Sequence, residues 1–191
     1  MLKKLPMLPK ESKIKVFIGA VCCTALLFLS FSANKISPRL QQKLNMAVQT
    51  TFEIEDFSLD LISISSDLNS KTAVELGSEN LFKVIQNEKL IGYVYLGQAP
   101  SMKNIFDYVV LFNRDLSIKK SKVLIYREDY GRQIGSQRWL KQFIGMRVNK
   151  AIRYGEDVDA IAGATISAKS MTKAVNDVLQ SIAVLQSEGF L

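Results

Sequence analysis

The sequence predicts an α+β fold: an antiparallel sheet of hairpins and a C-terminal amphipathic helix, with one transmembrane helix near the N-terminus. Three observations predict it: an early uncharged apolar run, two pairs of β-favouring segments in the middle, and a helical hydrophobic period at the end. Strands followed by a helix are typical of α+β domains. At 191 residues, the chain has room for one anchor and one domain.

The N-terminal region has the pattern of a membrane anchor. Residues 1–15 form a basic head with five lysines, and residues 16–33 carry no charge. A run of this length is just sufficient to cross a bilayer at about 1.5 Å per residue. The excess of lysines before the run places the N-terminus in the cytoplasm and the domain outside. A cleaved secretory signal is the alternative, because Ser30-Phe31-Ser32 offers small residues at a possible cleavage site. Both alternatives export the domain.

Residues 34–80 are expected to connect the anchor to the exported domain. Ser37 and Pro38 have the pattern of an N-cap and a first helical residue, and helical spacing of apolar residues follows. Alternation then begins at Phe52 and continues to Leu61, which predicts one or two short strands. A polar stretch over 67–80 is predicted to be a loop.

Residues 81–191 contain the main elements of the domain. Segments 81–85 and 90–96 flank a polar turn, which predicts one hairpin, and segments 105–112 and 118–126 predict a second. The second pair is rich in Val, Ile, Tyr and Phe, as expected for central strands. A short helical turn follows at 139–143. The closing helix has one apolar face, made up of Met171, Val175, Val178, Ile182 and Leu185.

Composition excludes many kinds of chemistry. The chain has no His, so it cannot form a Ser–His–Asp triad, a Cys–His dyad or a His-ligated haem. Its two cysteines, Cys22 and Cys23, are adjacent and cannot form a CxxC metal clip. The densest basic cluster of the domain, Lys119, Lys120 and Lys122, is interpreted as a solvated turn and not as a nucleic-acid site. Demanding chemistry must therefore come from a cofactor or a partner.

The segment from Asp159 to Ser167, DAIAGATIS, stands immediately before the closing helix. Its small residues would let the backbone approach another molecule closely. Thr165, Ile166 and Ser167 would lie where the helix exposes its unpaired N–H groups, which is a site suited to phosphate. The alternative is structural, because Thr and Ser before a helix commonly cap it.

This segment resembles the acceptor sequence Asp-x-x-x-Gly-Ala-Thr of the FMN-binding domain family. Relatives include the small flavin subunits of sodium-pumping NADH:quinone reductase and of ferredoxin:NAD oxidoreductase complexes. There a flavin transferase attaches FMN, through its phosphate, to the Thr hydroxyl. The resemblance implies esterification at Thr165, with Asp159, Gly163 and Ala164 as the recognition frame. The chain departs from the family at Ala162, where Ser or Thr is usual.

Further similarity covers residues 81 to 182. Ile91-Gly92-Tyr93 resembles a step in a family hairpin, and residues 128–135 occupy the place of the family's Glu-Thr-Pro-Gly loop. The resemblance implies that this loop lies against the flavin ring, with contacts from Glu128, Tyr130 and Gly131, where Tyr130 or Trp139 stacks on the ring. For Trp139 the alternative is a core or rim aromatic.

The resulting hypothesis is a membrane-anchored, periplasmic flavoprotein of the cytoplasmic membrane that carries covalent FMN and relays electrons. It would be an electron-transfer subunit of a membrane redox complex and not a self-sufficient enzyme, because no G-x-G-x-x-G nicotinamide fingerprint is present. Its expected partners are a flavin transferase, a membrane redox protein and the membrane. The alternative is an anchored scaffold without a redox role, which Ala162 and the altered loop favour.

Overall fold

The computed structural model describes residues 36–147 and 150–191, which belong to one compact unit, Ile36–Leu191. The predicted transmembrane segment at 16–33 lies outside these residues. Within the described part of the chain, no helix combines the length and the apolar character needed to cross a bilayer.

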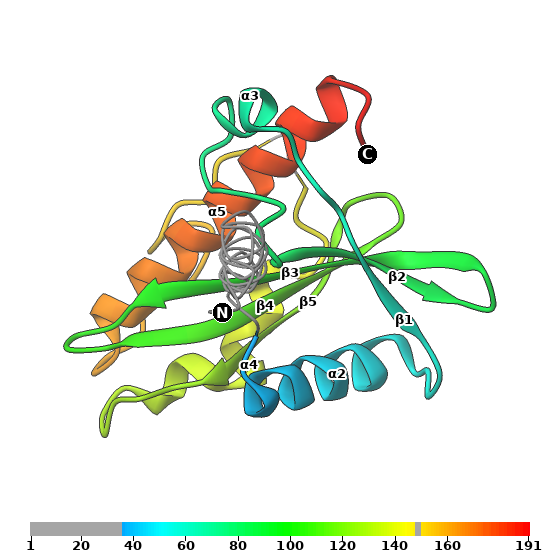
Figure 1. Ribbon diagram of the computed structural model, residues 1–191. Coiled ribbons are helices and arrows are strands. Elements are labelled where there is room, and N and C mark those ends of the chain that lie inside the picture. The colour runs from blue at the N-terminus through cyan, green and yellow to red at the C-terminus, as the bar shows by residue number, and fades with distance from the viewer. Residues whose placement is uncertain (1–35, 148–149) are drawn as a thin grey trace, which may run out of the picture. The chain divides into compact units, whose positions relative to one another are not determined.

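A five-stranded antiparallel sheet forms the middle layer of this unit (Figure 1). Its strands follow one another in sequence order: β1 (Ser58–Leu61), β2 (Leu81–Gln86), β3 (Lys89–Pro100), β4 (Ile105–Asn113) and β5 (Ile118–Ile125). The longest pairing joins β3 and β4 over nine residues, from Gly92 opposite Asn113 to Pro100 opposite Ile105. The predicted antiparallel sheet of hairpins is therefore confirmed.

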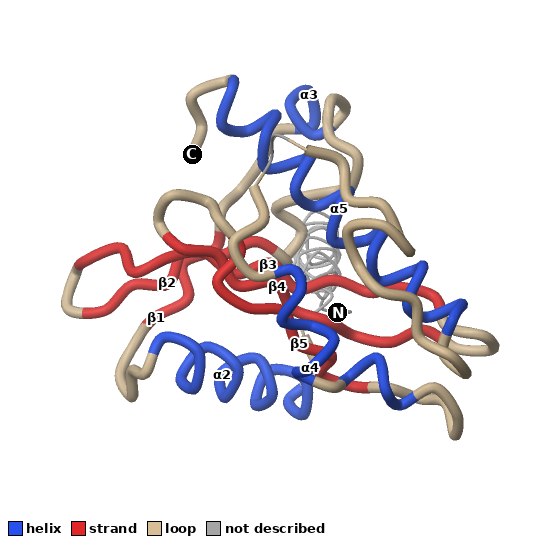
Figure 2. The backbone as a smooth tube through the Cα atoms, turned by 180° about the vertical axis from the view of Figure 1, so that it is seen from behind, coloured by secondary structure: helices blue, strands red, loops and turns tan. Residues whose placement is uncertain are grey.

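One helix covers each face of the sheet (Figure 2): α2 (Pro38–Phe52) on one side and α5 (Thr165–Ser187) on the other. Strand β4 is buried on both faces, since Val109 and Leu111 pack toward α2 while Tyr108 and Val110 pack toward α5. The five residues of the predicted apolar face of the closing helix are all fully buried. The α+β class and the C-terminal amphipathic helix are confirmed.

Short helices occupy the connections. Helix α3 (Ser66–Asn69) lies just before and within the predicted loop over 67–80, and Ser65 caps it. The helical turns η1 (Arg132–Gly135), α4 (Gln137–Leu140) and η2 (Lys141–Phe143) lie between β5 and α5. The predicted helical turn at 139–143 is therefore present and begins earlier, at Gln137.

The prediction that alternation starts a strand at Phe52 is wrong. Helix α2 continues through Phe52 and ends where Glu53 adopts a left-handed conformation, and β1 begins only at Ser58. The Phe52 ring packs over Gly92, where an added Cβ would lie 2.8 Å from the ring and 2.3 Å from the Phe112 carbonyl oxygen. This close approach explains the glycine in the Ile-Gly-Tyr step.

Strand β5 also differs from expectation, because it lies at an edge of the sheet and only β4 of the second hairpin is interior. The lysines interpreted as a solvated turn belong to this edge strand. Lys122 Nζ donates to Thr50 Oγ1 at 2.6 Å, and Lys119 Nζ lies 5.6 Å from the centre of the Phe52 ring. These two lysines therefore help to join the edge strand to α2.

Candidate functional site

The acceptor segment, residues 159–165, leads directly into α5. Gly163 adopts a left-handed conformation (φ +77°), and Ala164 is the N-cap residue, so no side chain caps the helix. Thr165 is the first helical residue and is exposed, and its hydroxyl makes only a long contact of 3.4 Å to the Ile161 carbonyl oxygen. The Thr165 hydroxyl therefore stands beside the positive end of a 23-residue helix.

A cavity of about 520 Å³ opens at this helix start, and three separate segments line it. They are the β3–β4 turn at 102–104, the segment at 126–131 after β5, and residues 163–167. This volume is within the range of about 300–1,000 Å³ that small-molecule sites occupy. Eight of the ten predicted site residues line the cavity: Glu128, Tyr130, Gly131, Gly163, Ala164, Thr165, Ile166 and Ser167.

Gly131 brings the two loops of the cavity together. Its φ is +75°, and an added Cβ would lie 2.9 Å from the Tyr126 hydroxyl oxygen and 3.3 Å from the Gly163 carbonyl oxygen. Gly131 therefore lies close to the acceptor segment, and its predicted contact with the flavin ring stays a prediction. Tyr126 adds a second link, because its hydroxyl oxygen lies 2.9 Å from Oγ of Ser167, which is buried.

Glu128 fixes the β3–β4 turn to the segment after β5. Its Oε1 accepts from the Ser101 hydroxyl at 2.7 Å, from the Lys103 N–H at 2.6 Å and from the Asn104 N–H at 2.9 Å. These donors, led by the Lys103 N–H, lower the pKa of Glu128 from 4.5 to about 2. Because the folded pKa is the lower one, the carboxylate stabilises the fold above pH 4.5, and this contribution is lost as the pH falls toward 2.

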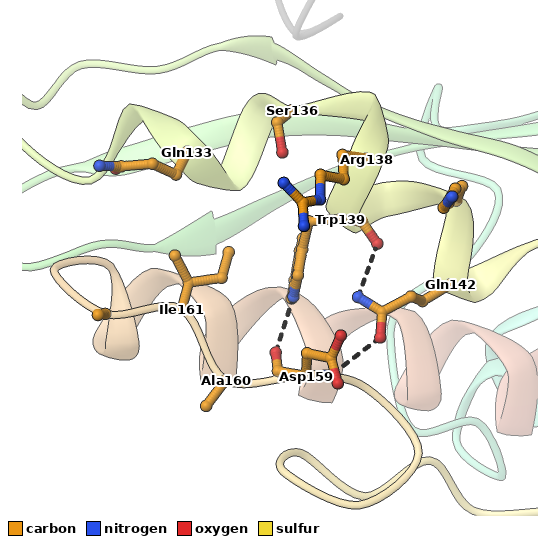
Figure 3. Close-up of a pocket in the computed structure, with 10 residues that line it drawn as sticks. Gln133, Ser136, Arg138, Trp139, Gln142, Asp159, Ala160 and Ile161 are labelled. Atoms are coloured by element: carbon orange, nitrogen blue, oxygen red, sulfur yellow. Dashed lines mark hydrogen bonds between the residues drawn. The ribbon is translucent and has the colours of Figure 1, made fainter.

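Trp139 and Asp159 lie at a different cavity, of about 530 Å³, which the first four residues of the acceptor segment line (Figure 3). The Trp139 indole is 5 % exposed, packs edge-on against Phe143, and donates from Nε1 to the Asp159 carbonyl oxygen at 2.8 Å. Gln142 Oε1 accepts from the Asp159 N–H at 3.0 Å. The Trp139 ring is thus packed as a core aromatic, and its stacking on a flavin ring stays a prediction.

Three exposed apolar side chains face the first cavity, and sequence reasoning identified two of them. Met102, Tyr130 and Ile166 are 72 %, 86 % and 54 % exposed, and each comes from a different lining segment. Exposed apolar side chains gathered at one place indicate a surface that binds an apolar group. Sequence reasoning did not identify Met102 as a site residue, although an apolar residue within the polar turn Ser-Met-Lys-Asn is a signal that could have indicated it. Tyr126 was missed because its partner, Ser167, is 41 residues away.

An exposed hydroxyl at a helix N-terminus, next to a cavity with apolar side chains, is an arrangement suited to a ligand that has both a phosphate and an apolar group. Residues 103–180 match the model of the FMN-binding domain family. The resemblance to that family is thereby confirmed, and FMN is the cofactor. The match begins in the β3–β4 turn and ends within α5, so it contains most of the first cavity.

The chain is also similar to a solved structure of NqrC from Shewanella oneidensis, with 20 % identity and a TM-score of 0.45. The alignment covers 61 % of this chain and 62 % of that chain, which is less than two thirds of either. No curated protein matches the sequence.

Proposed function

We propose that the domain carries FMN covalently at Thr165 and relays electrons as part of a membrane redox chain. The observation that carries this proposal is the position of Thr165, which is exposed, is the first residue of α5 and lines a cavity of about 520 Å³ together with three exposed apolar side chains. FMN, when bound, supplies one- and two-electron chemistry, while the protein supplies position and electrostatics.

The residues around Thr165 fit a phosphate ester. In the attachment step, Thr165 Oγ1 forms a bond to phosphorus and loses its proton, while the bond from phosphorus to the leaving group of the flavin donor breaks. The product keeps a negative charge beside the helix N-terminus, an interaction of about 0.3–1 kcal/mol for an exposed group. This is too weak to retain a diffusible flavin alone, so a covalent bond would provide the retention.

The apolar side chains fit the other end of the cofactor. Tyr130 and Ile166 line the same cavity as Thr165, and Ile166 directly follows Thr165 in the sequence. A planar ring lying between them would remove apolar surface from water, at about 25 cal/mol per Å². Gly163, two residues before Thr165, is exposed and has no side chain, so the acceptor segment is open to the flavin transferase at this point.

The test compares Thr165→Ala with Thr165→Ser after co-expression of the full-length chain with a flavin transferase. We expect the wild type to keep flavin fluorescence and the added mass of FMN on the Thr165 peptide after denaturation and washing. Thr165→Ala should lose both, while Thr165→Ser keeps a hydroxyl and should retain a part of the signal. Circular dichroism should show the same fold in all three, because the side chain is exposed.

Two outcomes would overturn the proposal. One is a wild-type Thr165 peptide that never carries FMN although the transferase modifies a known acceptor in the same cells. The other is full electron-transfer activity of the membrane fraction with Thr165→Ala, which would favour the scaffold function instead.

The membrane anchor, the periplasmic location and the membrane redox partner are parts of the same proposal and rest on the sequence of residues 1–33. Intact mass spectrometry of the purified protein distinguishes an anchor from a cleaved signal, because cleavage near residue 32 removes the head and the apolar run. Protease added to intact spheroplasts should digest the domain if it lies outside the cytoplasmic membrane.

A further inference from the structure

The β3–β4 turn, residues 101–104, contributes residues 102–104 as a third wall of the cavity, separate from the acceptor segment and from the segment at 126–131. The apolar residue of this turn is Met102, whose side chain is 72 % exposed. A methionine in this position leaves a flexible thioether in water, although thioethers make favourable contacts with aromatic rings. The exposure is therefore understandable if a planar group covers the side chain.

The turn is held in place from outside its own hairpin. Glu128 accepts hydrogen bonds from the backbone N–H groups of Lys103 and Asn104 and from the hydroxyl of Ser101. Asn104 Nδ2 also donates to the Arg127 carbonyl oxygen at 3.3 Å, and Arg127 is in turn paired with the buried carboxylate of Asp107 at 2.6 Å. The segment that carries Tyr130 thus fixes the segment that carries Met102.

We propose that Met102 covers one face of the FMN ring and that Glu128 is the positioning residue that holds Met102 there. This inference rests on the proposed location of FMN at Thr165. It changes the role of Glu128, for which the resemblance implied contact with the flavin ring. The residue acts instead through the turn, with three hydrogen bonds to a single oxygen.

The first experiment measures how well acrylamide, a neutral quencher, reaches the flavin in the full-length FMN-loaded protein. Met102→Ala should remove the cover, so the Stern–Volmer constant for quenching of flavin fluorescence should rise, with a shift of the visible absorption band. Met46→Ala is the matched control, because Met46 is 56 % exposed on α2, across the sheet from the cavity. An unchanged Stern–Volmer constant for Met102→Ala overturns the proposal.

The second experiment tests Glu128 by combining variants. Glu128→Ala should release the turn and raise quenching as Met102→Ala does, and Glu128→Gln, which keeps an acceptor oxygen, should restore part of the protection. The double variant Met102→Ala/Glu128→Ala should show no more quenching than Met102→Ala alone, since both changes remove the same cover. Additive increases would mean that Glu128 acts independently of Met102 and would overturn the positioning role.

Failure of this inference is distinguishable from failure of the proposed function. The mass of the Thr165 peptide shows whether FMN is attached, whereas acrylamide quenching shows whether Met102 covers the flavin ring. If FMN binds without a bond to Thr165, the same variants are compared on the non-covalent complex, with the same expected order. If FMN does not bind at all, both proposals are wrong.

Discussion

The helices on the two faces of the sheet begin in opposite ways. Helix α2 is capped by a residue directly before it. The Ser37 hydroxyl accepts from the Leu40 N–H at 3.4 Å, and Pro38 occupies the first turn. Helix α5 starts after Ala164, with no side-chain cap, although Thr165 and Ser167 lie in its first turn. Both helices are amphipathic and cover the core, so their different starts do not follow from packing.

Contacts from distant loops hold the start of α5. Ser167 bonds to Tyr126 of the segment after β5, and Gly131 of the same segment packs against Gly163 and Ala164. Further back, Trp139 holds the carbonyl group of Asp159. A helix start stabilised in this way leaves the Thr165 hydroxyl free of capping. Helix α2 therefore starts with a local cap, whereas α5 starts at the hydroxyl where we propose FMN attachment, and local rules are commonly broken at functional sites.

The largest expected effect on this comparison comes from Gly131→Ala. A left-handed conformation costs a residue with a Cβ about 1–2 kcal/mol, and the new Cβ would lie 2.9 Å from the Tyr126 hydroxyl oxygen. We expect the free energy of unfolding in urea to fall by about 2 kcal/mol and FMN attachment at Thr165 to slow, because the acceptor segment is displaced.

Gly135→Ala is the matched control for Gly131→Ala. An added Cβ at Gly135 meets no atom within 4 Å, and this glycine has no positive φ. Its unfolding free energy and its FMN attachment should stay close to those of the wild type. Equal losses in the two variants would show that the packing of Gly131 against Gly163 does not hold the acceptor segment.

A smaller effect is expected from Trp139→Phe, which keeps an aromatic ring against Phe143 but removes the Nε1 donor to Asp159. Loss of one such hydrogen bond, with the carbonyl group left partly buried, costs about 1 kcal/mol. The rate of FMN attachment should fall while the spectrum of attached FMN stays unchanged, since Trp139 does not line the cavity beside Thr165. A shifted flavin spectrum would instead place the indole against the ring.

The sequence predicted the features that depend on residues close to one another in the chain. Both hairpins, the apolar face of α5 and the Ser37 cap follow from periodicity and capping rules that act over a few residues. It failed where a contact is long-range, because Phe52 continues a helix and packs on Gly92 of a distant strand. The role of Glu128 could not be derived for the same reason, because its partners lie about 25 residues earlier in the β3–β4 turn.

The smallest expected effect is that of Ser37→Ala, and it tests the other half of the comparison. Removing an N-cap serine costs about 0.5–2 kcal/mol, and the long 3.4 Å contact in an exposed position favours the lower end of that range. The free energy of unfolding in urea should therefore fall slightly. FMN attachment and acrylamide quenching should stay at wild-type values, because α2 covers the face of the sheet away from α5. A change in the flavin signal that exceeds the change in stability would show that the two helix starts are coupled. The distinction between the start of α2, which serves stability, and the start of α5, which serves function, would then be wrong.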